Sequence, residues 1–90
     1  MPNMLSYFAW EVFPNPSQGE FVVRFETQSS FSGHLTVEDA AGRIVYREAI
    51  TEHSGIFEQK ITLENAQSGV YNVSIHANGR SITKRVVVQK

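Results

Sequence analysis

The sequence predicts an all-β fold, a seven-stranded antiparallel immunoglobulin-like β-sandwich. Apolar and polar residues alternate along most of the chain, which is the period of a half-buried strand. Six groups of turn-forming residues interrupt this alternation at regular intervals, as in sandwiches built from short strands. No run between these groups has the period of a helix.

The alternation also predicts the core. We expect the inward-facing residues to be Phe21, Val23, Phe25, Leu35, Val37, Phe57, Ile61, Tyr71, Val73 and Ile75. Residues 43–50 alternate less regularly, because Ile44, Val45 and Tyr46 are consecutive. For this strand we expect both faces to be partly covered.

The predicted turns lie at residues 14–19, 28–33, 40–42, 51–55, 64–69 and 78–79. Asn78-Gly79 is the clearest hairpin signal, because a two-residue type I′ turn needs positive φ at both central positions. Pro14 and Pro16 fix their own φ and donate no backbone hydrogen bond. Their segment therefore ends a strand and turns the chain toward the strand that follows Gly19.

Length and composition exclude several classes of protein. Ninety residues form one domain, and the absence of cysteine excludes disulfides and cysteine-based sites. No segment approaches the roughly 18 apolar residues of a membrane span. A net charge of −1 argues against nucleic-acid binding. Arg80, Lys84, Arg85 and Lys90 nevertheless cluster at the end of the chain, either to guard an edge strand against aggregation or as a docking patch.

Catalytic patterns are absent from the sequence. His34, His53 and His76 are far apart in the chain and have no metal-ligand spacing, so a zinc site would require the fold to bring them together. Ser54, His53 and Asp39 could form a triad only on paper, because no nucleophile elbow accompanies them. We expect no enzymatic activity, no cofactor and no bound metal.

Three motifs stand out. Pro14-Asn15-Pro16 is followed by a small residue, Gly19 and an alternating strand. An Asp39-Ala-Ala-Gly42 turn precedes a basic residue and an apolar run. Ser68-Gly69-Val70-Tyr71 begins the penultimate strand, and its tyrosine is similar to the tyrosine corner of immunoglobulin and fibronectin III sandwiches.

These motifs, in this order and before the final Lys84-Arg85-Val86-Val87-Val88-Gln89-Lys90, resemble the C-terminal sorting domain of type IX secretion substrates, the Por secretion system of Bacteroidetes. The resemblance covers residues 12–90. Its residues carry over to this chain as a sorting motif made of Pro14, Asn15, Pro16, Gly19, Gly42, Gly69, Tyr71, Lys84, Arg85, Val86, Val88 and Lys90.

The resemblance implies an address label. The cargo protein would lie upstream, with residues 1–11 as linker or extension and an export signal before Met1. The type IX translocon would recognise the domain, and a sortase-like peptidase would cut before Val12. The cargo would then be secreted or attached to the cell surface.

Two alternatives remain for parts of the chain. The domain could be a fibronectin III or immunoglobulin-like adhesion or glycan-binding module, with Tyr7, Trp10 and Phe31 as candidate stacking aromatics. The segment from Leu5 to Phe13 is apolar and poorly guarded by charge, so it is either a first strand across the sandwich or the contact of a weak homodimer.

Overall fold

A computed structural model describes residues 9–77 and 79–90, apart from the side chains of residues 9, 28, 29 and 53. These residues form five strands and no helix: β1 (Ala9–Phe13), β2 (Glu20–Glu38), β3 (Ile44–Thr62), β4 (Gly69–Ala77) and β5 (Arg80–Val88). Every pairing between them is antiparallel. Predictions for residues 1–8 and for Asn78 lie outside the described residues.

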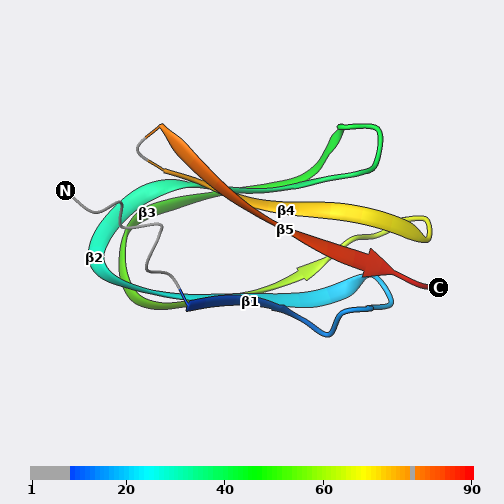
Figure 1. The fold of residues 1–90 in the computed structure, drawn as a ribbon, viewed down its shortest axis with the longest axis horizontal. Helices are drawn as coiled ribbons and strands as arrows, with labels where there is room; N and C mark the ends of the chain where they lie inside the picture. The colour runs from blue at the N-terminus through cyan, green and yellow to red at the C-terminus, as the bar shows by residue number, and fades with distance from the viewer. Residues whose placement is uncertain (1–8, 78) are drawn as a thin grey trace.

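Strands β2 and β3 bend together and run through both layers of the molecule (Figure 1). The first layer contains β1, residues 20–27 of β2 and residues 55–62 of β3. The second contains residues 44–50 of β3, residues 33–38 of β2, β4 and β5. The five strands therefore make seven segments, and the predicted antiparallel sandwich of seven strands is confirmed.

The expected breaks at 28–33 and 51–55 are bends within continuous strands. The pairing of β2 with β3 shifts register between Thr27 and Phe31 and again between Phe31 and Gly33. Opposite these shifts, Glu52 and Gly55 have positive φ, of 42° and 86°. Such irregularities bend a paired strand without ending it. The positions of these two changes in chain direction were therefore predicted correctly, but both strands continue through them.

The order of segments differs in one place from an immunoglobulin constant-type sandwich, which also has seven strands in two sheets. There the fourth strand lies beside the fifth. Here residues 44–50, the fourth segment, pair with residues 33–38, the third. The fourth segment is thus an edge of the second layer.

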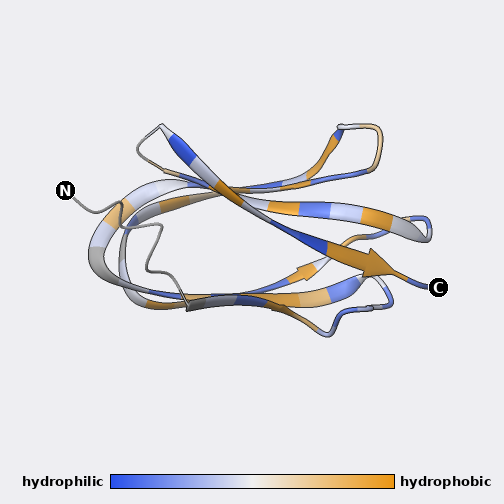
Figure 2. Ribbon diagram, in the orientation of Figure 1, coloured by the Kyte–Doolittle hydropathy of each residue, from blue (hydrophilic) through white to orange (hydrophobic). Residues whose placement is uncertain are grey.

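The core lies between the layers and contains all ten residues predicted from the alternation, joined by Val12, Phe31, Ile50, Leu63, Ala77, Val86 and Val88. Hydrophobic residues appear as orange bands along the strands (Figure 2). The ring of Phe25 stacks on that of Phe57 with centroids 4.8 Å apart. Residues 43–50 differ from expectation at two positions: Ile44 and Val45 are exposed at the start of this edge segment, whereas Tyr46 packs against the core.

Candidate functional site

The segment of residues 14–17, which we call the clasp, lies along the outer edge of β5. The Asn15 side chain makes two hydrogen bonds to the β5 backbone. Its Nδ2 donates to the carbonyl oxygen of Arg85 (3.1 Å), and its Oδ1 accepts from the backbone N–H of Val87 (2.9 Å). The carboxamide thus presents one donor and one acceptor, as a neighbouring strand would.

Ser17 continues this pairing with its backbone. Its N–H donates to the carbonyl oxygen of Val87, and its own carbonyl accepts from the N–H of Gln89, both at 2.8 Å. Ser17 is buried and forms an isolated parallel bridge with Val88. The clasp therefore covers the β5 edge from Arg85 to Gln89. Because neither proline has an N–H, only Asn15 and Ser17 supply donors.

Gly19 joins the clasp to the last residue of the chain. Its φ is +103°, and a Cβ at this position would lie 3.1 Å from Cε of Lys90. Its carbonyl oxygen accepts from the N–H of Leu63 (2.8 Å). The backbone N–H of Lys90 in turn donates to Oγ of Ser68 (2.9 Å), so the chain end is held between the clasp and the loop that precedes β4.

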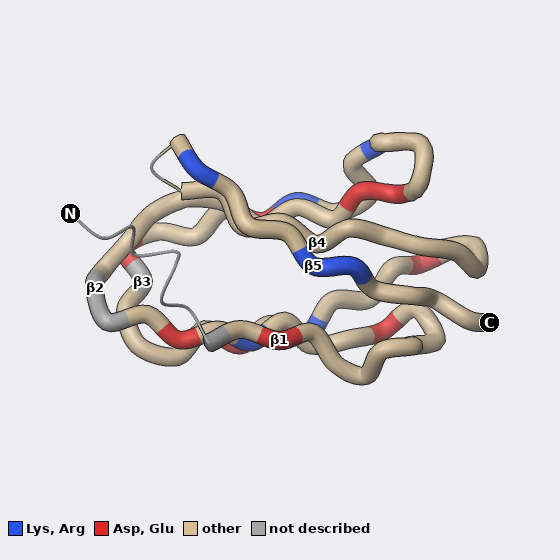
Figure 3. Tube along the Cα trace, viewed as in Figure 1, with Lys and Arg blue, Asp and Glu red and all other residues tan. Residues whose placement is uncertain are grey.

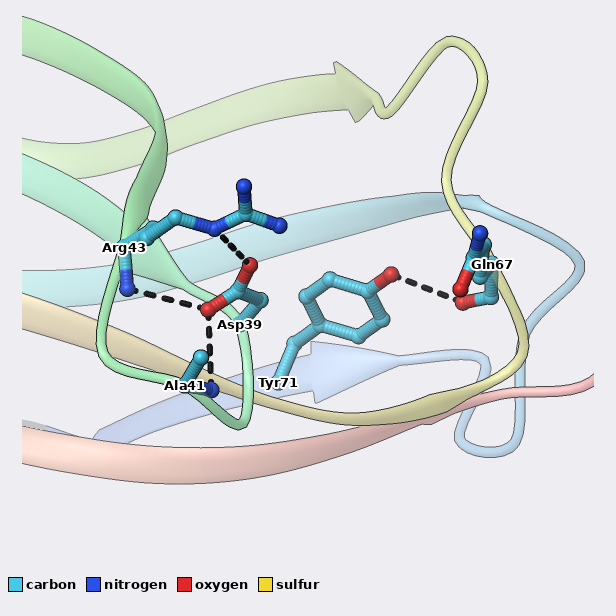
Figure 4. Close-up of polar contacts among 5 residues, drawn as sticks. All are labelled: Asp39, Ala41, Arg43, Gln67 and Tyr71. Atoms are coloured by element: carbon cyan, nitrogen blue, oxygen red, sulfur yellow. Dashed lines mark hydrogen bonds and ion pairs between the residues drawn. The ribbon is translucent and has the colours of Figure 1, made fainter.

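The Gly69–Tyr71 motif lies next to this chain end. Gly69 pairs with Val88 and Tyr71 with Val86 across the β4–β5 ladder. The Tyr71 hydroxyl donates to the carbonyl oxygen of Gln67 at 2.7 Å (Figure 4). A buried tyrosine at the start of the penultimate strand, bonded to the backbone a few residues upstream, is a tyrosine corner. The sequence predicted this feature, and the structure confirms it.

The Asp39–Gly42 motif forms a tight turn. Both oxygens of the Asp39 carboxylate accept hydrogen bonds within it. Oδ1 of Asp39 accepts from the N–H groups of Ala41 and Arg43, both at 2.9 Å, and Oδ2 accepts from Nε of Arg43 at 3.0 Å (Figure 4). The backbone bond from Arg43, followed by the other contacts in the turn, lowers the pKa of Asp39 below its ordinary value. Gly42 has φ +86°, a conformation that favours glycine. The role of Asp39 is therefore to shape the turn.

A groove of about 590 Å³ lies between this turn and residues 62–71, which include the loop between β3 and β4. Tyr71 and Gly69 line it on one side and Asp39 and Arg43 on the other. The clasp, the groove and the chain end thus lie at one end of the sandwich, where the C-terminus is drawn in Figure 1.

The sorting-motif residues predicted from the sequence fall into three groups. Most of them lie in the clasp, in the part of β5 and the chain end that it contacts, or in the β4 residues paired with that part: Pro14, Asn15, Pro16, Gly19, Gly69, Tyr71, Arg85, Val86, Val88 and Lys90. Gly42 lies in the turn across the groove. Lys84 lies apart, with its Nζ 5.5 Å from the centre of the Trp10 ring on the other layer.

Two serines within the predicted motifs were not counted among the sorting residues, and the structure shows contacts for both. Ser17 and Ser68 hold the C-terminal residues through a backbone and a side-chain contact, respectively. Both stand beside a predicted motif residue, but a serine in a turn is too common in proteins to mark a long-range contact. Their partners, Val87, Gln89 and Lys90, are about 20 to 70 residues away in the chain, and only the fold reveals them.

Charges are unevenly distributed between the layers. Lys84 and Arg85 form a basic stretch on β5, whereas the described part of β1 carries an acidic residue, Glu11 (Figure 3). Glu11 and Glu58 lie on either side of Arg24, each with an N–O distance of 3.6 Å. These pairs are exposed, and such pairs contribute little to stability. Of these two basic residues, Arg85 lies beside the clasp and Lys84 lies over the Trp10 ring of the other layer.

The two described aromatics named for the alternative of glycan binding, Trp10 and Phe31, do not form an exposed stacking platform. Phe31 is only 4% exposed and packs against Phe25 with ring centroids 5.6 Å apart. Trp10 is partly buried against the core beneath Lys84. Tyr7 lies outside the described residues. Strand β2 continues through residue 31 with a bend, and the Phe31 ring faces the core. The predicted turn at residues 28–33 would instead have placed this ring in a loop.

Among residues 9–77 and 79–90 there is no helix with the length and apolarity needed to cross a membrane.

Comparison with known families gives a match over nearly the whole sequence. The model of the secretion system C-terminal sorting domain matches residues 11–89, which is nearly the whole chain. Comparison with curated proteins gives no match. The matched range begins in β1 and ends beside Lys90, so it includes the clasp, the groove and the β5 edge.

Proposed function

Because the chain belongs to the family of secretion system C-terminal sorting domains and is a type IX sorting signal of a secreted or cell-surface protein, we propose that the translocon recognises the clasp together with the β5 edge. The observation that carries this proposal is the pair of hydrogen bonds from Asn15 to Arg85 and Val87. They join the two ends of the family match into one surface. The signal is then a folded surface, and neither end presents it alone.

The exposed groups of this surface supply the chemistry of recognition. Arg85 and Lys90 are exposed beside the clasp, whereas Val86 and Val88 are buried in the core. The two valines therefore act by holding β5 in place, and the two cations are available to a partner. An acidic or carbonyl-rich surface on the translocon would complement them.

We further propose that a sortase-like peptidase removes the domain by cutting ahead of Ala9. Residues Ala9–Phe13 form β1 and pair with β2, and Val12 belongs to the core. A peptidase needs an extended, accessible backbone, which a paired strand does not offer without local unfolding. The domain itself acts as the substrate of this step and contributes no catalytic group.

A reporter fusion in a type IX-competent bacterium tests the recognition surface. We expect residues 1–90, placed after a periplasmic reporter, to carry it to the cell surface. The double variant Arg85→Gln, Lys90→Gln should leave the reporter in the periplasm, while folding with unchanged stability because both side chains are exposed. Lys60→Gln is the matched control, since Lys60 is an exposed cation in the other layer.

The outcomes separate surface recognition from simple folding. Deleting residues 84–90 should also abolish delivery, but this deletion removes two core valines and so unfolds the domain. Delivery that survives the double variant would show that Arg85 and Lys90 are not read. Delivery in a strain without the translocon would overturn the sorting function itself.

A further inference from the structure

The groove between the Asp39 turn and residues 62–71 has apolar walls. Val45 lines it from β3 and Val70 from β4, and these residues are 45% and 40% exposed. The other apolar side chains along it are those of Ala40, Ala41, Leu63, Ala66 and Tyr71. Single exposed apolar residues are ordinary on a protein surface, whereas apolar residues gathered in one place and rimmed by polar ones mark an interaction site.

A β-bulge exposes the apolar residues at the rim of this groove. In the β2–β3 ladder Val37 pairs with Tyr46 but Glu38 pairs with Ile44, so Val45 is an extra residue with no partner on β2. A regular strand would place Ile44 and Val45 on opposite faces, but both are exposed, Ile44 by 54%. Bulges are frequent at sheet edges and beside active sites, where they re-aim side chains. Here the bulge presents two apolar side chains to solvent.

Arg43 supplies a polar group beside these apolar walls. Its Nε donates to Oδ2 of Asp39 (Figure 4), and its side chain is 82% exposed. Its two terminal amino groups have no protein partner among residues 9–77 and 79–90, whereas the Asp39 carboxylate balances its charge. Glu64 also lines the groove and would repel an acidic ligand. The donors of Arg43 therefore suit an uncharged acceptor, such as a peptide carbonyl.

The groove adjoins the clasp through two of its lining residues. The N–H of Leu63 donates to the carbonyl oxygen of Gly19, and Oγ of Ser68 accepts from the N–H of Lys90. The chain is a type IX sorting signal, so the secretion machinery is its partner. A partner that contacts the clasp therefore reaches the groove as well.

We propose that the groove binds an uncharged, apolar segment of the secretion machinery, with an apolar side chain against Val45 and Val70 and a peptide carbonyl at the terminal amino groups of Arg43. This inference rests on the proposed function and adds a second contact to it. The two contacts differ in chemistry, because the clasp offers the cations Arg85 and Lys90 and the groove offers apolar surface. Salt should weaken the first contact and leave the second largely unchanged.

The reporter fusion of residues 1–90 tests the groove through position 45. Val45→Asp and Val45→Lys should each lower the fraction of reporter at the cell surface at least about tenfold, because either charge must lose its water against an apolar ligand. Val45→Ile should preserve delivery. Ile56→Asp is the matched control, since Ile56 is an equally exposed apolar residue of β3 in the other layer and outside the groove. Thermal unfolding of each purified 90-residue chain shows that the variants are folded.

The pattern of delivery decides the outcome. Delivery that survives both Val45→Asp and Val45→Lys would show that the groove is not read. Loss with Val45→Asp alone would mean an acidic ligand, and equal loss with Ile56→Asp would mean an effect unrelated to the groove; each contradicts the proposal. Self-association in sedimentation that Val45→Asp removes would make a second copy of the chain the occupant. Failure of the unmodified chain to reach the surface would instead overturn the sorting function, and this inference with it.

Discussion

Replacing Asn15 with alanine should loosen the C-terminal strand from the rest of the domain. The change removes the bonds from Asn15 to the carbonyl of Arg85 and the N–H of Val87. A typical hydrogen bond contributes about 0.5–1.5 kcal/mol net, so two contribute about 1–3 kcal/mol. Both bonds are exposed, and water partly replaces them; we therefore expect a loss of about 1–2 kcal/mol.

This loss is measurable by thermal and chemical unfolding. In a domain of 60–100 residues, each kcal/mol shifts the melting temperature by about 4–8 °C, so Asn15→Ala should melt about 4–16 °C lower. Amide exchange gives the local readout. The Val87 amide should exchange faster than in the unmodified chain, because its acceptor is the atom removed.

Gln18→Ala is the matched control for this experiment. Gln18 is an exposed amide in the same connection between β1 and β2, three residues after Asn15. Its replacement should change the melting temperature by no more than a degree or two, as for an ordinary surface substitution. If Asn15→Ala behaves like Gln18→Ala and the Val87 amide keeps its protection, the clasp does not hold β5.

The remaining predictions concern the core, the pairing of β2 with β4, the turn and the N-terminal segment. Val73→Asp should abolish the cooperative unfolding transition seen by circular dichroism, because a buried unpaired carboxylate costs several kcal/mol, while Val45→Asp, at an exposed position, should fold normally. Gly33→Ala should lower the free energy of unfolding by at least about 2 kcal/mol in urea titrations, since its Cβ would lie 2.0 Å from a β4 carbonyl oxygen. The lowered pKa of Asp39 means that its contribution to stability is present above about pH 4 and is lost as pH falls through the folded-state value; Asp39→Asn should flatten this part of the acid limb in pH-dependent unfolding. Sedimentation of residues 1–90 and 11–90 should show weak self-association only in the longer chain; equal behaviour of the two would contradict a contact through residues 5–13.

The clasp gives the signal a physical property that suits transport. Its two halves are far apart in the sequence, and they form one surface only in the folded domain. A translocon that reads this surface therefore distinguishes folded from unfolded domains. An unfolded domain would present the same residues without their relative positions.

The sequence alone determined the class of the fold and the content of the core. Strict alternation at positions such as Phe21, Val23 and Phe25 assigns each residue to a face, and a residue on the wrong face would bury charge. The tyrosine corner was also predictable, because Tyr71 and its partner Gln67 are four residues apart and their contact is local. Where periodicity failed, as at Ile44 and Val45, the prediction of partial burial was wrong, since local sequence does not show which strand is an edge.

Only the tertiary structure decided which distant residues meet. Pro14-Asn15-Pro16 was recognisable as a stiff corner, but nothing in it specifies that the asparagine bonds to a strand 70 residues later. The bends of β2 and β3 likewise follow from pairing between the two strands, and they bury Phe31. His34 and His76 meet because β2 pairs with β4 in one register. Such contacts depend on register and on the crossing between layers, which are set by the packing of the whole core and not by any local pattern.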